Sequence, residues 1–153
     1  MNANEIGLVA AAFALVGAGV GIVGAAATGW AEAALATAAT GETARFGPVF
    51  VAQSYLAVTA AVLVGAVPLA GVLGVLVGSR ARGVTAAAVT CGLGTGLGAL
   101  AYGLVAVTMI VVSQGDAAAQ AHGLVDALVP TLATAFVSGA VGASTGVLGT
   151  VMR

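Results

Sequence analysis

The order of apolar and polar residues divides the chain into four long apolar stretches. They cover about residues 6–40, 46–78, 83–113 and 118–151. Each exceeds the ~20 residues with which a helix crosses the hydrocarbon core of a bilayer. Polar breaks at 40–45, 79–82 and 113–116 separate them. Because backbone in lipid must satisfy its own hydrogen bonds, such spans are helices. The pattern predicts an all-α, polytopic membrane protein of four transmembrane helices, arranged as two tandem hairpins.

Composition strengthens this prediction and narrows the classes of partner. Of the 153 residues, 61% are hydrophobic and 6% are charged, whereas a soluble domain carries about 25% charged residues. We therefore expect a multi-pass protein of a prokaryotic cell membrane, with the lipid bilayer as its first partner. The net charge of −1 comes without a basic stripe or an aromatic platform, which argues against nucleic acid as a partner.

The two halves of the chain resemble each other. A shift of 75 residues places Gly17, Gly19 and Gly21 on Gly92, Gly94 and Gly96, and a shift of 76 places residues 46–47 on 122–123. Such self-similarity is typical of a repeat, although a chain rich in glycine, alanine and valine gives some matches by chance. We predict two duplicated units, residues 1–78 and 79–153, each a transmembrane hairpin.

Glycines at alternate positions mark the first and third predicted helices. Small residues let membrane helices approach closely, and close packing is a main force that associates helices in lipid. We expect these residues to form packing faces, and we expect a homo-oligomer or other membrane subunits to cover part of them. The alternative is ordinary small-residue packing inside a lone four-helix bundle. The packing residues are Gly17, Gly19, Gly21, Gly24, Gly92, Gly94, Gly96 and Gly98.

Two short sequence segments resemble those of a known protein family. Residues 45–53 read Arg-Phe-Gly, then apolar residues, then Gln53, and residues 123–128 read Gly-Leu-Val-Asp-Ala-Leu around Asp126. Together with the duplicated, glycine-rich hairpins, they make the chain similar to the proteolipid (subunit K or c) of V-type and A-type rotary ATPases. The similarity covers nearly the whole chain in architecture and about a dozen specific residues.

This resemblance implies a rotor subunit of an ATP synthase or ion pump that translocates H⁺ or Na⁺. Asp126 would carry the ion, Gln53 would support it, and bound H⁺ or Na⁺ would be the only cofactor. A carboxylate inside a membrane is by default a functional hypothesis, because its burial costs several kcal/mol.

Two departures from the family motivate a second hypothesis. The family's carboxylate lies about eleven residues beyond the Phe-Gly position, where this chain has Ala133. Arg80, Arg82 and Arg153 share one side of a four-span protein, and this bias places the termini in the cytoplasm, opposite to the family. The second hypothesis is a noncatalytic structural or accessory subunit in which Asp126 favours the positive end of a helix dipole. A small-molecule transporter is a third, weaker alternative.

Covalent enzyme chemistry is not expected from this sequence. The single histidine, His122, lies at a loop edge and has no nucleophile within its span, and the single cysteine, Cys91, lies in an apolar run as a small packing residue. Trp30, Tyr55 and Tyr102 either anchor the helices at interfaces or pack between them. We expect a subunit that has no catalytic activity alone and no metal site.

Overall fold

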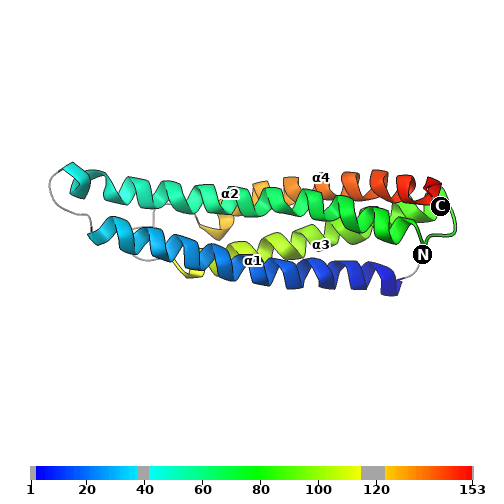
Figure 1. Cartoon of the computed structure of the whole chain (residues 1–153), viewed down its shortest axis with the longest axis horizontal. Helices are drawn as coiled ribbons and strands as arrows, with labels where there is room; N and C mark the ends of the chain where they lie inside the picture. Colours follow the sequence, from blue (N-terminus) through cyan, green and yellow to red (C-terminus); the bar gives the residue numbers. More distant parts are fainter. Residues whose placement is uncertain (1–2, 38–41, 115–122, 153) are drawn as a thin grey trace.

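The chain folds into four long helices that lie side by side (Figure 1). This computed structural model describes residues 3–37, 42–114 and 123–152. The helices are α1 (Ala3–Thr37), α2 (Glu42–Gly78), α3 (Val84–Val112) and α4 (Leu124–Val151). All four are long and apolar enough to cross a membrane. The prediction of an all-α, four-helix membrane protein is confirmed.

Two helix boundaries differ from the expected ones. Helix α2 begins at Glu42, inside the polar break expected at 40–45. Helix α4 begins at Leu124, whereas the apolar run begins near residue 118. The described part of the chain does not include residues 115–122, of which His122 is the last, or Arg153.

Glycine does not prevent helix formation here. The chain contains 24 glycines, and in water each would cost a helix interior about 1 kcal/mol relative to alanine. In lipid an unpaired backbone group costs more than that, so the helix continues through glycine, and it continues through proline with the loss of the one hydrogen bond that proline cannot donate. Helices α2 and α4 accordingly continue through Pro48, Pro68 and Pro130.

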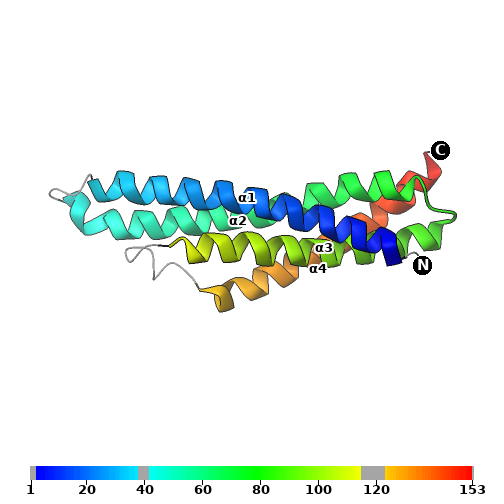
Figure 2. The ribbon, with the colours of Figure 1, turned by 90° about the horizontal axis from the view of Figure 1, so that it is seen from below.

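The two hairpins pack so that helices of the same direction lie together. Helix α1 runs parallel to α3: Val9 lies against Gly94, Phe13 against Gly98 and Gly17 against Tyr102, a step of four residues on both helices. Helix α2 runs parallel to α4 in the same way, through Gly74 with Gly142 and Gly78 with Gly146. Within each hairpin the helices are antiparallel, so both termini lie at one end of the bundle (Figures 1 and 2).

Helix α3 is the most enclosed element, because alternate glycines serve two neighbours. Residues two apart on a helix differ by about 200° in direction, so they face nearly opposite sides. Gly94 and Gly98 face α1, at Val9 and the Phe13 ring, whereas Gly92 and Gly96 face α4 at Gly139. The glycine pattern of α3 therefore allows close approach on both sides at once.

Helix α1 uses its glycines on one side only. A Cβ atom at Gly17 would lie 2.8 Å from the Tyr102 Cα, and one at Gly21 would lie 3.0 Å from the Ala106 Cα. Gly24 packs against Ile110 in the same way, at 3.0 Å. A Cβ atom at Gly19 would meet nothing within 4 Å. Seven of the eight predicted packing glycines thus have close neighbours inside the same chain, and the homo-oligomer stays a prediction.

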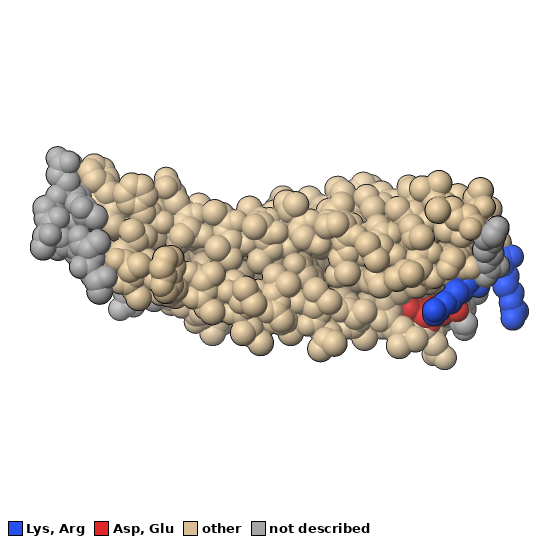
Figure 3. Space-filling view, viewed as in Figure 1, with Lys and Arg blue, Asp and Glu red and all other residues tan. Residues whose placement is uncertain are grey.

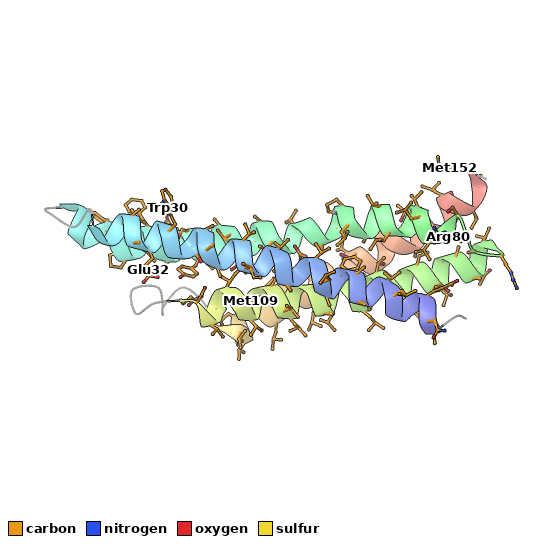
Figure 4. The ribbon with its side chains drawn as sticks, turned by 60° about the horizontal axis from the view of Figure 1, so that its bottom comes forward. Trp30, Glu32, Arg80, Met109 and Met152 are labelled. Atoms are coloured by element: carbon orange, nitrogen blue, oxygen red, sulfur yellow. The ribbon has the colours of Figure 1, made fainter. Side chains whose placement is uncertain are left out.

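The first hairpin extends beyond the second at one end of the bundle. Helices α1 and α2 contain 35 and 37 residues, against 29 and 28 for α3 and α4, a difference of about two turns. The extra turns project past α3 and α4 at the end away from the termini (Figures 1 and 2). Trp30 lies near this end and is 75% exposed (Figure 4).

Alanine at Gly17 and at Gly19 provides a matched test of this packing. Gly17→Ala forces α1 away from the Tyr102 backbone and should lower the free energy of unfolding by about 2 kcal/mol. Gly19→Ala adds a methyl group to open space and should leave that free energy unchanged or slightly higher. Helix content followed by circular dichroism during SDS titration of micelle-solubilised protein measures both. Equal destabilisation by the two variants would contradict the assigned faces.

Candidate functional site

Asp126 lies at the start of α4, in the first turn of the helix. Its Oδ2 accepts a hydrogen bond from the Gly123 N–H at 2.9 Å, and the side chain is exposed. The position satisfies one of the free N–H groups at a helix N-terminus and places a negative charge at the positive end of the helix dipole. Asp126 is therefore a helix-capping residue in this structure.

The structure does not bring Gln53 and Asp126 together. Gln53 is exposed on α2 and makes no hydrogen bond to a described residue. The neighbours of Asp126 lie elsewhere: Ala127 packs in a small apolar cluster with Leu63 and Val107. Gln53 lies ten residues before Leu63, which corresponds to about 15 Å along α2. The two residues therefore do not form a common site within one chain.

Ala133 marks the place where the resemblance implies a carboxylate. The residue is exposed on α4, two turns further into the helix than Asp126. Pro130 lies between them and has no N–H to give to the Asp126 carbonyl, one turn earlier. The α4 surface at the depth of Ala133 is therefore apolar, and the acid lies nearer the helix end.

A cluster of polar groups lies near the end of α3. It connects residues of α1 and α2 with the segment that follows α3. The Tyr55 ring, on α2, is fully buried, and its Oη lies 3.3 Å from Glu32 Oε2 of α1 and 3.3 Å from the Ser113 carbonyl oxygen after α3. Thr28, one turn before Glu32, is also fully buried and donates to the Gly24 carbonyl at 2.9 Å. The phenol thus donates to acceptors on two neighbouring elements.

Only part of this cluster is visible in the sequence. In a tight hairpin whose turn centres near residue 41, position 28 on the first helix faces position 55 on the second, so Tyr55 lies beside Thr28. A tyrosine is long enough to reach Glu32, one turn further. The contact with Ser113 depends on where α3 lies along the first hairpin. The sequence alone does not predict that position.

The other buried polar side chains are small hydroxyls. Among the described residues they are Thr28, Thr59, Thr90, Thr95, Thr131 and Ser138. Thr131 donates to the Ala127 carbonyl of its own helix at 2.7 Å, while Thr95 also donates across to the Ser138 carbonyl at 3.0 Å. Such bonds satisfy the Thr131 and Thr95 hydroxyls locally, whereas the buried Ser138 Oγ has no hydrogen-bond partner among the described residues.

The cysteine and the tyrosines have packing roles. Cys91 is buried and free, and it lies against Gly146 of α4. Tyr102 is buried, donates from Oη to the Val62 carbonyl at 2.8 Å, and packs edge-to-face on Phe13 with ring centroids 6.4 Å apart. Within the described part of the chain, no three of His, Cys, Asp and Glu lie close enough together to hold a metal ion.

Comparison with known protein families, characterised proteins and solved structures gives no match for this chain.

Phenylalanine at position 55 tests the three-helix cluster. Tyr55→Phe removes the phenol O–H that lies within reach of both the Glu32 carboxylate and the Ser113 carbonyl, and should lower the free energy of unfolding by about 1 kcal/mol. Glu32→Gln keeps an acceptor oxygen and should have a smaller effect. The same SDS titration measures both variants, and a Tyr55→Phe protein as stable as wild type would show that the phenol only fills space.

Proposed function

We propose that the chain is a noncatalytic structural subunit of a larger membrane complex. The observation that carries this proposal is the position of Asp126, an exposed residue that caps α4 and has no part in the packed interior. A carboxylate that loads and releases an ion within lipid needs a site that holds it in low dielectric. The buried polar groups of the described residues are Thr and Ser hydroxyls and the phenols of Tyr55 and Tyr102, and none of these side chains is a carboxylate.

The projecting part of the first hairpin is the surface offered to a partner subunit. Helices α1 and α2 are about 52 and 55 Å long at 1.5 Å per residue, against a hydrocarbon core of about 30 Å. Their extra turns carry exposed apolar side chains: Trp30 at 75%, Phe46 at 47%, Val49 at 51% and Phe50 at 51%. A helical partner of similar length would cover these side chains and remove them from water.

The cellular setting belongs to the same proposal. Arg80 and Arg82 lie in the short connection at the end of the bundle that holds both termini. The enrichment of arginine in cytoplasmic loops supports a cytoplasmic location for this end. The projecting end of the first hairpin then faces the opposite side of a prokaryotic cell membrane.

Photo-crosslinking at two phenylalanines tests the partner surface. A photoreactive phenylalanine analogue at Phe50, on the projecting turns, should give one discrete adduct with a different membrane protein after illumination of native membranes. The control is the same analogue at Phe136, which is 81% exposed on α4 and should give no discrete protein adduct. Absence of an adduct at position 50, or the same adducts at both positions, would contradict the proposal.

Ion translocation is the second candidate, and the order of the helices favours it. The two hairpins lie side by side in one orientation, with α1 along α3 and α2 along α4, as a rotor built from repeated hairpins requires. Asp126 is exposed on α4, where a separate subunit could reach it. In this candidate, neighbouring copies or a stator supply the low-dielectric site, and Asp126 binds H⁺ or Na⁺ there.

Substitution and labelling of Asp126 distinguish the two candidates. A structural subunit predicts that Asp126→Asn keeps an acceptor for the Gly123 N–H, costs less than about 1 kcal/mol of stability, and leaves H⁺ or Na⁺ transport by the native complex unchanged. An ion carrier predicts loss of transport, and Na⁺-protected labelling of Asp126 by a carbodiimide at mildly alkaline pH. Glu32→Gln serves as the control for the loss of an unrelated carboxylate.

A further inference from the structure

An open apolar groove runs along the bundle between α1 and α2. Its middle part encloses about 630 Å³ and is lined by small and branched side chains of both helices, with Tyr102 of α3 beneath them. A second hollow of about 210 Å³ lies between the same helices, nearer the end that holds the termini. Helices α1 and α2 pack against each other more sparsely than α1 packs on α3 or α2 on α4, which leaves this side of the bundle open.

The two hollows are parts of one groove. On α1 their walls include Ala12 and then Val16, Val20, Val23 and Ala27. These positions recur every three or four residues, so they form a single stripe along the helix. On α2 the walls follow the same spacing through Val62, Leu69, Leu73, Val77 and Arg80. The two hollows therefore lie in line on one side of the bundle, from Arg80 to its middle.

Opposite charges line the outer end of this groove. Glu5 of α1 and Arg80, just after α2, both border the smaller hollow. Figure 3 shows cationic and acidic side chains together at one end of the molecule and none on the rest of the described surface in that view. Figure 4 labels Arg80 at this end. The groove thus has one acidic and one basic side chain at its outer end, and apolar side chains along the rest of its walls.

We propose that this groove binds one phospholipid whose head group carries both a phosphate and a primary ammonium, as in phosphatidylethanolamine. The Arg80 guanidinium contacts the phosphate, the Glu5 carboxylate contacts the ammonium, and one acyl chain lies between α1 and α2. Charge-assisted bonds of guanidinium to phosphate are among the stronger polar contacts. A head group of net negative charge would be repelled by the Glu5 carboxylate, which lines the same hollow as Arg80.

The dimensions of the groove fit an acyl chain. From Arg80 to Val62 the groove follows about 27 Å of helix, which exceeds the ~15 Å depth of one leaflet, so a whole chain lies within it. At Gly24 the two helices are already in contact: a Cβ atom there would lie 3.3 Å from the Val58 Cγ1.

Native mass spectrometry of the full chain in detergent, with added phosphatidylethanolamine of 16–18 carbons per chain, tests the proposal. We expect one retained lipid per wild-type chain. Arg80→Gln removes the phosphate contact and should lower retention about fivefold or more. Its control, Arg82→Gln, removes an exposed arginine of the same connection and should keep retention within about twofold of wild type. Diacylglycerol, which lacks the phosphate, should be retained weakly by all three proteins.

A second pair of variants tests the acyl-chain part of the groove. Ala61→Phe fills the groove wall and should lower lipid retention, whereas Ala133→Phe adds the same ring to the exposed surface of α4 and should not. If Ala61→Phe does not fold, as judged by helix content and elution volume, Val72→Phe narrows the same groove at a position that is 58% exposed.

Four results would overturn the proposal. The first is wild-type protein that retains no phospholipid. The second is equal retention by Ala61→Phe and Ala133→Phe. The third is Arg80-dependent binding of inorganic phosphate that matches the lipid in strength, which would make the site a plain anion site. The fourth is a lipid-free dimer that Ala61→Phe converts to monomer, which would assign the groove to a second copy of the chain.

Discussion

The close approach of helix backbones at glycine determines the rest of this structure. Lipid provides no hydrophobic drive for one apolar helix to join another, so association depends on contact distance. At Gly17, Gly98, Gly142 and Gly146 an added Cβ atom would lie 2.8 Å or less from atoms of the neighbouring helix. The position of α3 between α1 and α4 follows from these contacts. Where α1 and α2 lack comparable contacts, the bundle opens into a groove.

The number and type of the helices follow directly from the sequence. A chain with four long apolar runs and 6% charged residues is suited to lipid and not to water. In lipid the backbone of such runs must form helices to satisfy its hydrogen bonds. Boundaries are less certain, because a helix continues past the hydrocarbon wherever polar residues can pair with water. Helix α2 shows this by beginning at Glu42, within the expected break.

The candidate site is harder to predict, since it depends on the rotation and depth of each helix. Alternate glycines in α1 and α3 look equivalent in sequence, yet Gly94 lies against Val9 while Gly19 faces open space. In the same way, Asp126 is two turns from position 133 in sequence, and that shift moves the acid from the middle part of α4 to its capped end. In the cluster of Tyr55, Glu32 and Ser113, the first two residues follow from the hairpin of α1 and α2, whereas the position of Ser113 depends on tertiary packing alone.

The sparse contact between α1 and α2 has a consequence for biogenesis. During insertion these two helices enter the bilayer first, and their main close-packed partners, α3 and α4, are still to be synthesised. The first hairpin therefore resides in lipid as two loosely associated helices until the second hairpin arrives. Parallel packing of α1 on α3 and of α2 on α4 then locks all four helices in one late step. A translocon or chaperone that retained the first hairpin until that step would protect the protein at its least assembled stage.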